Sequence, residues 1–326
     1  YNEAERRGLV VARVGSGTYV RGKDQVNTVI HQMSQDILGQ IDMRAAFAPE
    51  GPQSQMLSSA MASMAANPQL LNDLLRYAPE LGHPNHRDSF RRWLEAEPVT
   101  LHECDFLITH GGQHAISVSI NALCREGDVI LTENLVFPGV LAAAQDQGVK
   151  VVPVAMDEQG IIPENVLLAC KRHKPRVIYL TPNNQNPCGT QLSKERRQAL
   201  IDICQEYNVV ILEDDVQFLA RSDKAMSMQQ MAPEQCIYLS SFSKRFSGAM
   251  RIGVLVAPAA LYNKLRLSLR ASSWTNSPLL IHWLCDWMDS GELAKLEDWL
   301  EREMIERQAL AREYLSPWAP YSQTSS

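Results

Sequence analysis

The sequence lacks several features that would mark whole classes of protein. Its seven cysteines include no Cys-x-x-Cys pair, and an odd, scattered set does not fit a disulfide framework. No apolar run reaches the roughly 18 residues that a membrane-spanning helix needs. Positive charge is also in deficit, because 31 Lys and Arg stand against 37 Asp and Glu. We therefore expect reduced thiols, a cytoplasmic location, no membrane partner and no broadly basic surface, although one small basic patch is compatible with these counts.

What is present is the composition of an ordinary globular protein, with 45% hydrophobic and 21% charged residues. A chain of 326 residues can form one large domain or two smaller ones around a sizeable core. It begins with Tyr1 rather than Met and ends on "YSQTSS", soon after a long helical stretch. We expect it to be a fragment of a longer protein, cut at both ends.

The first 55 residues differ in pattern from the rest. "NEAERRG" is typical of a helix that ends at Gly8. "LVVARV" and "TYVRG" are short β-rich runs around Gly15-Ser16-Gly17, which predicts a hairpin. Residues 23–40 are polar and compatible with a helix, and residues 44–55 form a loop with two prolines. We expect a domain boundary near residue 40.

From about residue 57, short apolar runs alternate with segments of helix length. The runs cover residues 106–110, 128–133, 150–156, 176–182, 209–214, 236–241 and 251–257. Such alternation predicts an α/β fold with right-handed crossovers and a mostly parallel seven-stranded sheet, flanked by helices. The seventh run follows the sixth after only a short segment, so we expect it to be the antiparallel strand.

Four of these predicted strands end in residues suited to binding a ligand. Ligands of open α/β sheets bind at the carboxyl ends of the strands. "GGQ" follows the first run, "NNQNPCG" the fourth, "DD" stands at the end of the fifth, and "SFSK" ends just after the sixth. A lysine, a carboxylate, an amide and backbone donors would therefore meet at one edge of the sheet. Pyridoxal phosphate (PLP) needs such a set, because it offers an aldehyde, a pyridine nitrogen and a phosphate.

Each of these requirements finds a residue in the sequence. Lys244 would be the catalytic lysine that holds the aldehyde as a Schiff base. Asp214 follows the apolar "VVIL", where an unpaired carboxylate is costly, so it would hold the pyridinium. Asn186 would donate to the ring oxygen. The candidates for binding the phosphate are Gly112, Gln113, Ser241, Ser243 and Arg251. Phe137 would cover the face of the ring.

Each residue alone also has an ordinary structural explanation. A single lysine is usually exposed, Asp214 could cap a strand, and Phe137 could belong to the core. The order decides between these interpretations, because suitable chemistry follows the appropriate strand at four separate places.

Two histidine pairs and one tryptophan pair have suggestive spacings. His83 with His86, and His110 with His114, could suggest a metal, but no carboxylate or cysteine cluster accompanies them, so we expect no metal site. His114 is more simply placed in the first turn of the phosphate-binding helix. The i, i+4 spacing of two tryptophans predicts a packing stripe made by Trp283 and Trp287.

Residues 70–315 resemble the fold-type-I aminotransferases that bind PLP. "SFSK…RIG" resembles the lysine motif of that family, and "EDD" its aspartate motif. "NPCG" resembles its Asn-Pro-Thr/Ser-Gly motif, in which the Asn-Pro bond is often cis. "RYAPELGHPNHRDSFRRWL" resembles its Tyr-x-x-x-x-Gly segment. The resemblance implies that Tyr77 reaches the cofactor phosphate of a neighbouring subunit, and hence a homodimer.

"YNEAERRGLVVARVGSGTYV" resembles the end of a GntR-type winged helix, with the tail of the recognition helix followed by the wing. A winged helix joined to an aminotransferase-like domain is the hallmark of MocR-type transcriptional regulators. The resemblance implies a regulator that senses PLP or an amino-acid adduct and binds promoter DNA through its full-length winged helix. Arginines that would suit DNA phosphate contacts are Arg6, Arg7, Arg13 and Arg21.

The resemblance also implies a division into domains. Residues 1–22 would be the remnant of the winged helix, without its base-reading surface, and residues 23–55 a linker and N-terminal arm. Residues 56–290 would form the large PLP-binding domain. Residues 291–326 would be the interdomain helix and the start of a small domain.

Two departures from the family and one alternative accompany these expectations. Relatives carry a tyrosine two or three residues beyond the aspartate, where this chain has Val216 and Gln217; Gln217 could donate instead. The family's substrate-binding arginine lies in the small domain, which we expect beyond Ser326, so transamination should be weak or vestigial. The alternative is a working aminotransferase of the aromatic or 2-aminoadipate type, in which the hairpin only decorates the enzyme.

Overall fold

The structure is a computed structural model that describes residues 10–13, 17–20 and 46–315. It divides into two compact units, Tyr1–Ala45 and Ala46–Ser326. In the first, β1 (Val10–Arg13) pairs antiparallel with β2 (Gly17–Val20), which confirms the predicted pairing of the two runs. Several expectations lie outside the described residues: the helix end at 2–7, residues 23–40, the side chain of Arg13, and Arg6, Arg7 and Arg21.

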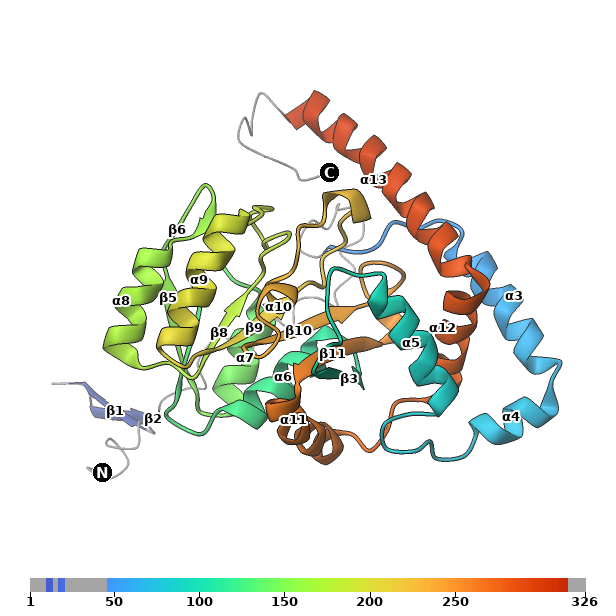
Figure 1. The fold of residues 1–326 in the computed structure, drawn as a ribbon, viewed down its shortest axis with the longest axis horizontal. Coiled ribbons are helices and arrows are strands. Elements are labelled where there is room, and N and C mark those ends of the chain that lie inside the picture. Colours follow the sequence, from blue (N-terminus) through green and yellow to red (C-terminus); the bar gives the residue numbers. More distant parts are fainter. Residues whose placement is uncertain (1–9, 14–16, 21–45, 316–326) are drawn as a thin grey trace. The chain divides into compact units, whose positions relative to one another are not determined.

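A seven-stranded sheet forms the centre of the second unit (Figure 1). Its spatial order is β3-β11-β10-β9-β8-β4-β5. Adjacent strands run parallel except at β11, which is antiparallel to both of its neighbours, so the predicted fold and the predicted antiparallel strand are confirmed. The strands are β3 (Cys104–Thr109), β4 (Val129–Glu133), β5 (Lys150–Val154), β8 (Val177–Leu180), β9 (Val210–Asp214), β10 (Cys236–Ser241) and β11 (Gly253–Pro258).

A two-residue ladder beyond β5 was not predicted. The strand β5 ends at Val154, and β6 (Met156–Asp157) then pairs with β7 (Gly160–Ile161). The turn between them is held by the Asp157 carboxylate, which accepts from the backbone N–H of Gln159 at 2.8 Å. The apolar run at 150–156 therefore covers parts of two strands, and its composition alone does not reveal the break.

Helices cover both faces of the sheet, because successive side chains of a strand point to opposite sides. Val177 and Tyr179 of β8 pack with the helices of one face, while Ile178 and Leu180 pack with those of the other. The first face carries α6 (Gly112–Leu123), α7 (Pro138–Asp146) and α11 (Ala259–Ser272). The opposite face carries α8 (Pro163–His173), α9 (Lys194–Glu206), α10 (Met228–Met231), α5 (Pro84–Glu95) and α12 (Pro278–Ser290).

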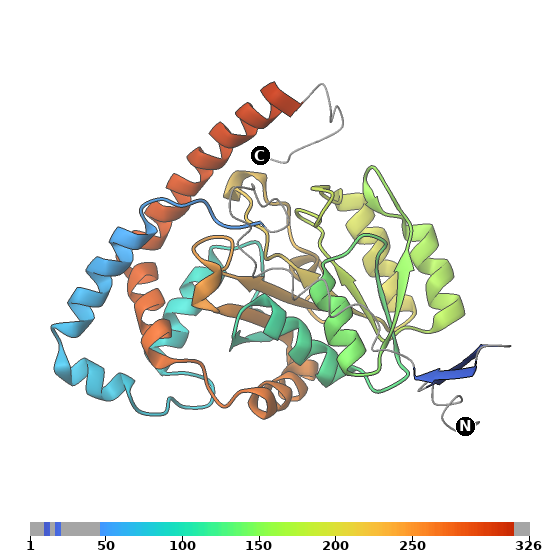
Figure 2. The same ribbon diagram turned by 180° about the vertical axis from the view of Figure 1, so that it is seen from behind.

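The helices α3 (Gln53–Ala65), α4 (Pro68–Leu74) and α13 (Glu292–Leu315) gather beside α12, as the view from behind shows (Figure 2). The first turns of α13 bury Leu293, Leu296 and Leu300, whereas no residue of its second half is buried. Among the described helices, none is both long enough and apolar enough to cross a membrane. The remaining described elements are two short 3-10 turns, η2 (Arg221–Asp223) and η3 (Gly248–Met250).

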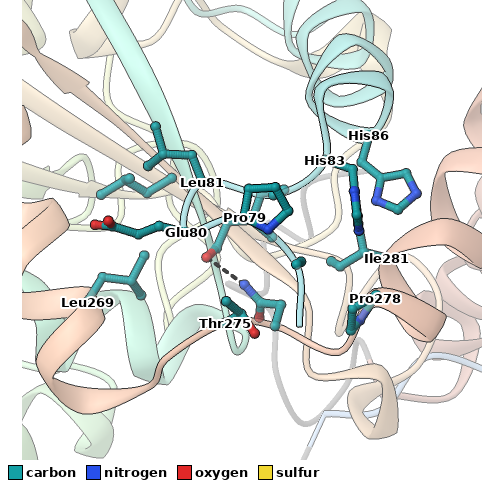
Figure 3. A pocket seen from close by; sticks show the side chains of 14 residues that line it. Pro79, Glu80, Leu81, His83, His86, Leu269, Thr275, Pro278 and Ile281 are labelled. Carbon is teal, nitrogen blue, oxygen red and sulfur yellow. Dashed lines mark hydrogen bonds between the residues drawn. The ribbon is translucent and has the colours of Figure 1, made fainter. Parts of the chain in front are cut away.

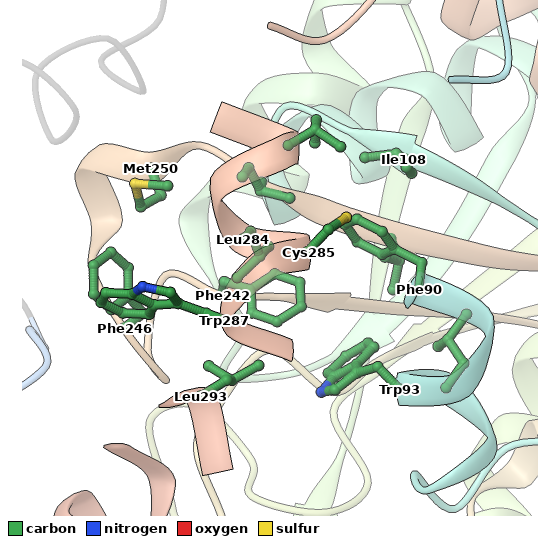
Figure 4. Close-up of a cluster of buried hydrophobic side chains, with 14 of the residues drawn as sticks. Phe90, Trp93, Ile108, Phe242, Phe246, Met250, Leu284, Cys285, Trp287 and Leu293 are labelled. Atoms are coloured by element: carbon green, nitrogen blue, oxygen red, sulfur yellow. The ribbon is translucent and has the colours of Figure 1, made fainter. Parts of the chain in front are cut away.

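An aromatic cluster anchors the segment that follows β10 (Figure 4). Phe242 lies 4.8 Å from Trp93 between ring centroids, and Phe246 lies 5.2 Å from Trp283. Trp283 and Trp287 stack edge to face at 4.8 Å and are both buried, which confirms the predicted packing stripe. Burial of large aromatic side chains on both sides of position 244 fixes the backbone around it.

Candidate active site

Strand alternation determines which acidic side chain of β9 can reach the ligand-binding side. Leu212 packs with the helix α6 cluster, so Asp214, two residues later, points to the same face. Asp215 continues toward the other side, where it accepts from Tyr238 at 2.6 Å and from Lys224 at 3.1 Å. Asp214 is therefore the carboxylate on the side of the α6 N-terminus.

The start of α6 lies directly over the ends of β9 and β10. A Cβ atom added to Gly112 would come within 2.8 Å of Val216 Cγ2 and 3.7 Å of Ser241 Cβ. The first N–H groups of a helix have no partner within the helix, and they attract anions. The close approach requires a residue without a side chain, so Gly112 brings these donors next to Ser241.

Serine and arginine side chains surround the same helix N-terminus. Ser241 and Ser243 lie 2.9 Å apart through their hydroxyl oxygens. Arg251, in the left-handed region with φ 52°, donates from Nη2 to the His110 carbonyl at 3.1 Å. A Cβ on Gly111 would lie 2.9 Å from the same Nη2, so the guanidinium covers this glycine. Hydroxyls, a guanidinium and helix N–H groups thus form a cup suited to a phosphate.

Lys244 lies in the segment between the two anchored phenylalanines. It is half-buried, and its Nζ donates to the Ala46 carbonyl at 2.5 Å. No acidic side chain of the described residues pairs with it, and burial lowers the pKa of its amine. A partly desolvated, unpaired amine is the form that attacks a carbonyl most readily.

Asp214 is the only one of three consecutive acidic residues that no described cation approaches. Glu213 faces Arg197 at 3.7 Å, and Asp215 faces Lys224. Asp214 is 6% exposed and accepts from Tyr179 at 2.5 Å and from the Val216 N–H at 3.0 Å. Burial raises the pKa of its carboxyl to about 6, and the charge of Asp215 adds to this. Such a carboxylate would gain from a cationic partner.

The segment before Asn186 is fixed by Glu133 at the end of β4. Its Oε2 accepts from the Thr181 hydroxyl at 2.8 Å and from Gln185 Nε2 at 3.2 Å. The Asn186-Pro187 bond that follows is cis, as in the resembled motif. Among the described residues, Asn186 finds no hydrogen-bond partner for its side chain and is half-buried, which leaves its amide available to a ligand.

Phe137 and Gln113 meet where α6 and α7 begin. Gln113 Nε2 donates to the Gly139 carbonyl at 2.9 Å, so its side chain binds α7 and only its backbone is available to an anion. A Cβ on Gly139 would lie 2.2 Å from the Phe137 ring, which places this half-buried ring beside the start of α6.

Three other expectations have simpler outcomes. Tyr77 lies in the connection between α4 and α5 with 86% of its surface exposed, and it does not join the other candidates within one chain. Val216, one of the two positions at which the resembled family would carry a tyrosine, packs against Gly112, and Gln217, the other position, is half-buried. His114 lies in the first turn of α6, as predicted, with Nδ1 accepting from the His110 N–H and Nε2 2.8 Å from the Ser272 hydroxyl.

The sequence reasoning missed a buried ionic group beside the site. Glu97 accepts from Lys224 at 2.6 Å and from Arg245 at 2.8 Å. Burial alone would raise the pKa of Glu97, but the charges of Arg245 and Lys224 hold it at about 2. Arg245 also reaches Glu297 of α13 at 2.7 Å. The signal that could have revealed this group lies next to the site residues in the sequence. Arg245 follows Lys244 and Asp215 follows Asp214, and both are charged residues within apolar segments.

A small cavity of about 30 Å³ lies elsewhere, lined in part by His83, His86 and Leu81 (Figure 3). His86 Nε2 lies 3.3 Å from Nδ1 of His282. None of the candidate cofactor-binding residues lines this cavity, so it is separate from the site at the strand ends.

The comparisons with known proteins show the family and the fold of the chain. The sequence pattern of the aminotransferase class I and II family matches residues 49–314. The chain belongs to that family. Its cofactor is PLP, and its fold type I architecture is shared with the multiple substrate aminotransferase of Thermococcus profundus, at a TM-score of 0.78 and 17% identity over 91% of this chain and 75% of that one.

Two curated relatives of this family member carry names of different kinds, one a regulator and one an enzyme. The uncharacterized HTH-type transcriptional regulator YdeF of Bacillus subtilis is 25% identical over 97% of this chain and 68% of its own length. The mitochondrial kynurenine/alpha-aminoadipate aminotransferase of Mus musculus is 28% identical over 70% of this chain. The chain spans only 60% of the length of that enzyme.

The residues of this aminotransferase-like site fit PLP. Asp214 is buried without a described cation, Lys244 is half-buried without a described acid, and Gly112 brings helix N–H groups to two serines. When bound, PLP supplies an aldehyde for the amine and an electron-withdrawing pyridinium ring. Lys244 would hold the aldehyde carbon, Asp214 the ring nitrogen, and the cup at α6 the phosphate.

Proposed function

We propose that the chain is part of a PLP-dependent transcriptional regulator of the MocR type. In this proposal the aminotransferase-like unit binds PLP at Lys244 and senses the cofactor, or its adduct with an amino acid. The winged helix of the full-length protein binds promoter DNA. The β1–β2 hairpin then corresponds to the wing, and residues 23–55 to the linker and N-terminal arm.

The observation that carries this proposal is the extent of the similarity. The match to the regulator YdeF covers 97% of the chain, whereas the match to the mouse aminotransferase covers 70%. The HTH-type regulator YdcR of Escherichia coli likewise matches 98% of the chain. The family pattern begins at residue 49, so these long sequence matches extend over the hairpin unit, which lies outside the residues that match the family.

A working aminotransferase of the aromatic or 2-aminoadipate type is the second candidate. It is favoured by the higher identity to the mouse enzyme, 28% against 25% for YdeF, and by a site whose lysine, aspartate and phosphate cup are all present. The absence of a tyrosine at both Val216 and Gln217 favours a site that binds PLP but turns over slowly.

Gene deletion followed by complementation separates the two candidates. Deleting the gene in its own organism should change the transcript level of a small set of genes, and Lys244→Ala should fail to restore it. An aminotransferase would instead change the levels of one amino acid and its 2-oxo acid. Restoration of transcript levels by Lys244→Ala, or an unchanged transcriptome with an altered amino-acid pool, would contradict the proposal.

The proposed assembly is a homodimer. Tyr77, with 86% of its side chain exposed, would reach the phosphate cup of the second subunit, and Trp274, 61% exposed, would add apolar surface. Sedimentation of the PLP-saturated protein should give the mass of a dimer. A PLP-saturated monomer would contradict this assembly.

A further inference from the structure

The carboxylate of Asp214 is held by a tyrosine that lies on the neighbouring strand. Tyr179 belongs to β8, which pairs in parallel with β9, and its side chain is fully buried on the same face of the sheet. Its hydroxyl donates to Asp214 Oδ2 at 2.5 Å, while the Val216 N–H donates to Oδ1 at 3.0 Å. Each carboxylate oxygen therefore has one donor, which fixes the plane of the group.

The other charges near Asp214 are negative. The charge of Asp215 raises the pKa of Asp214, and the charge of Asp214 raises the pKa of Glu133 of β4. Both Asp214 and Glu133 also raise the pKa of the Tyr179 hydroxyl. Burial raises the pKa of the Tyr179 hydroxyl well above its usual range, so this group remains a donor. Hydrogen bonds to the ionised form are thus what favours the carboxylate over the carboxylic acid in apolar surroundings.

We propose that Tyr179 is a positioning residue for the cofactor site, which keeps Asp214 ionised and oriented so that the proton stays on the pyridine nitrogen of PLP. This inference rests on the proposed binding of PLP by Lys244 and Asp214. It gives a role to a residue outside the lysine, aspartate and Asn-Pro motifs, and it acts through Asp214 rather than by touching the cofactor.

The chain contains a matched control for this hydrogen bond. Tyr238 of β10 is equally buried and donates to Asp215 Oδ2 at 2.6 Å. Asp215 also accepts from Lys224 at 3.1 Å and from Asn183 at 3.0 Å, and it faces the other side of the sheet. Tyr238→Phe therefore removes the same kind of bond at the same depth without altering the donors of Asp214.

The visible absorption of bound PLP reports whether the Lys244 nitrogen attached to it is protonated, and the pKa of that nitrogen depends on the charge of the ring nitrogen. A protonated ring nitrogen withdraws electrons from the rest of the cofactor. It therefore lowers the pKa of the Lys244 nitrogen that is bound to the cofactor. Without the Tyr179 hydroxyl, the proton shared with Asp214 moves toward the carboxylate. The midpoint of the pH-dependent absorption change should then rise by roughly 0.5 unit or more.

The experiment titrates the visible absorption of PLP-saturated protein against pH for five forms: wild type, Tyr179→Phe, Tyr238→Phe, Asp214→Asn and the double variant Tyr179→Phe/Asp214→Asn. Circular dichroism checks that each is folded. We expect Tyr179→Phe and Asp214→Asn to raise the midpoint, Tyr238→Phe to leave it unchanged, and the double variant to match Asp214→Asn. A sixth form carries 3-fluorotyrosine at position 179, a stronger donor that should lower the midpoint even if Tyr179→Phe does not fold.

The outcomes distinguish this inference from the function on which it rests. If Asp214→Asn raises the midpoint but neither change at position 179 moves it, Tyr179 has no positioning role. Additive effects in the double variant, or an equal shift in Tyr238→Phe, would also overturn the inference, because the effect would not run through Asp214. If PLP does not bind, or if Asp214→Asn changes nothing, the proposed cofactor site itself is wrong.

Discussion

Lys244 and Asp214 are both partly or fully buried, although removing an ionisable group from water is unfavourable. A half-buried amine without a described acid and a buried carboxylate without a described cation both raise the free energy of the protein on their own. PLP would satisfy both, because its aldehyde binds the amine and its ring nitrogen supplies the cation. At the scale of single residues, the site therefore lacks a partner for its amine and a cation for its carboxylate, and this cofactor would supply both.

Lys244→Ala tests the attachment point. The wild-type protein with PLP should show a visible absorption band at a longer wavelength than that of free PLP. Borohydride should fix the cofactor to Lys244, as a mass spectrum of the digested protein would show. Lys244→Ala should lose both signals, because Lys224, the buried lysine beside the site, is paired with Glu97 and Asp215. Lys264→Ala, an exposed position on α11, is the control and should retain both signals. A label on a different lysine would refute the assignment.

Asp214→Asn tests the partner of the ring nitrogen. The change removes a hydrogen bond between charged groups, worth about 1.5–3 kcal/mol, so the dissociation constant of PLP should rise roughly 10- to 100-fold. Fluorescence titration with PLP measures it. Asp202→Asn, exposed on α9, should leave the constant unchanged. Normal affinity in Asp214→Asn together with a loss in Asp215→Asn would show that the neighbouring carboxylate holds the cofactor.

At the scale of elements, the sequence predicted the sheet well and the contacts between strands poorly. Each of the seven strands is an apolar run, largely buried in every case except the edge strand β5, so composition and spacing reveal it, and the polar residues at four strand ends then predict the site. The bond from Tyr179 to Asp214 and the group around Glu97 join positions far apart in the chain. No local pattern encodes such pairs. A buried hydroxyl or charge only signals that some partner exists.

Gly253→Ala tests how β11 brings the phosphate cup together. A Cβ at this position would lie 2.9 Å from the backbone of both Gly111 and Ser240, which cannot move without displacing β3 or β10. We expect a loss of about 1–3 kcal/mol in the free energy of unfolding, together with weaker PLP binding. Urea unfolding measures the first effect. Gly248→Ala, where the added methyl group meets open space, should change stability by less than about 0.5 kcal/mol. Equal effects of the two substitutions would contradict the packing described here.

At the scale of the whole molecule, buried acids make stability depend on pH. Burial raises the pKa of Glu133 to about 7, while Thr181 and Gln185 oppose the rise by donating to it. Burial also raises the pKa of Asp214 to about 6. A carboxyl whose pKa is higher in the folded than in the unfolded protein binds its proton more tightly when folded. Its contribution is therefore fully present below the unfolded pKa and is lost as the pH rises through the folded one.

Glu133→Gln isolates one of these groups, because glutamine keeps the shape and cannot ionise. Between pH 5 and pH 8 the wild-type protein should lose stability relative to Glu133→Gln by about 3 kcal/mol, since the wild type must ionise a buried carboxyl over that range. Urea unfolding of both proteins at the two pH values measures the difference. Because the charge of Asp214 raises the pKa of Glu133, the same comparison in an Asp214→Asn background removes the contribution of Asp214. Glu158→Gln, at an exposed position, should show no such change between the two pH values. A stability difference between wild type and Glu133→Gln that is the same at both pH values would mean that Glu133 is ionised throughout, and that its three hydrogen bonds from Thr181 and Gln185 outweigh its burial.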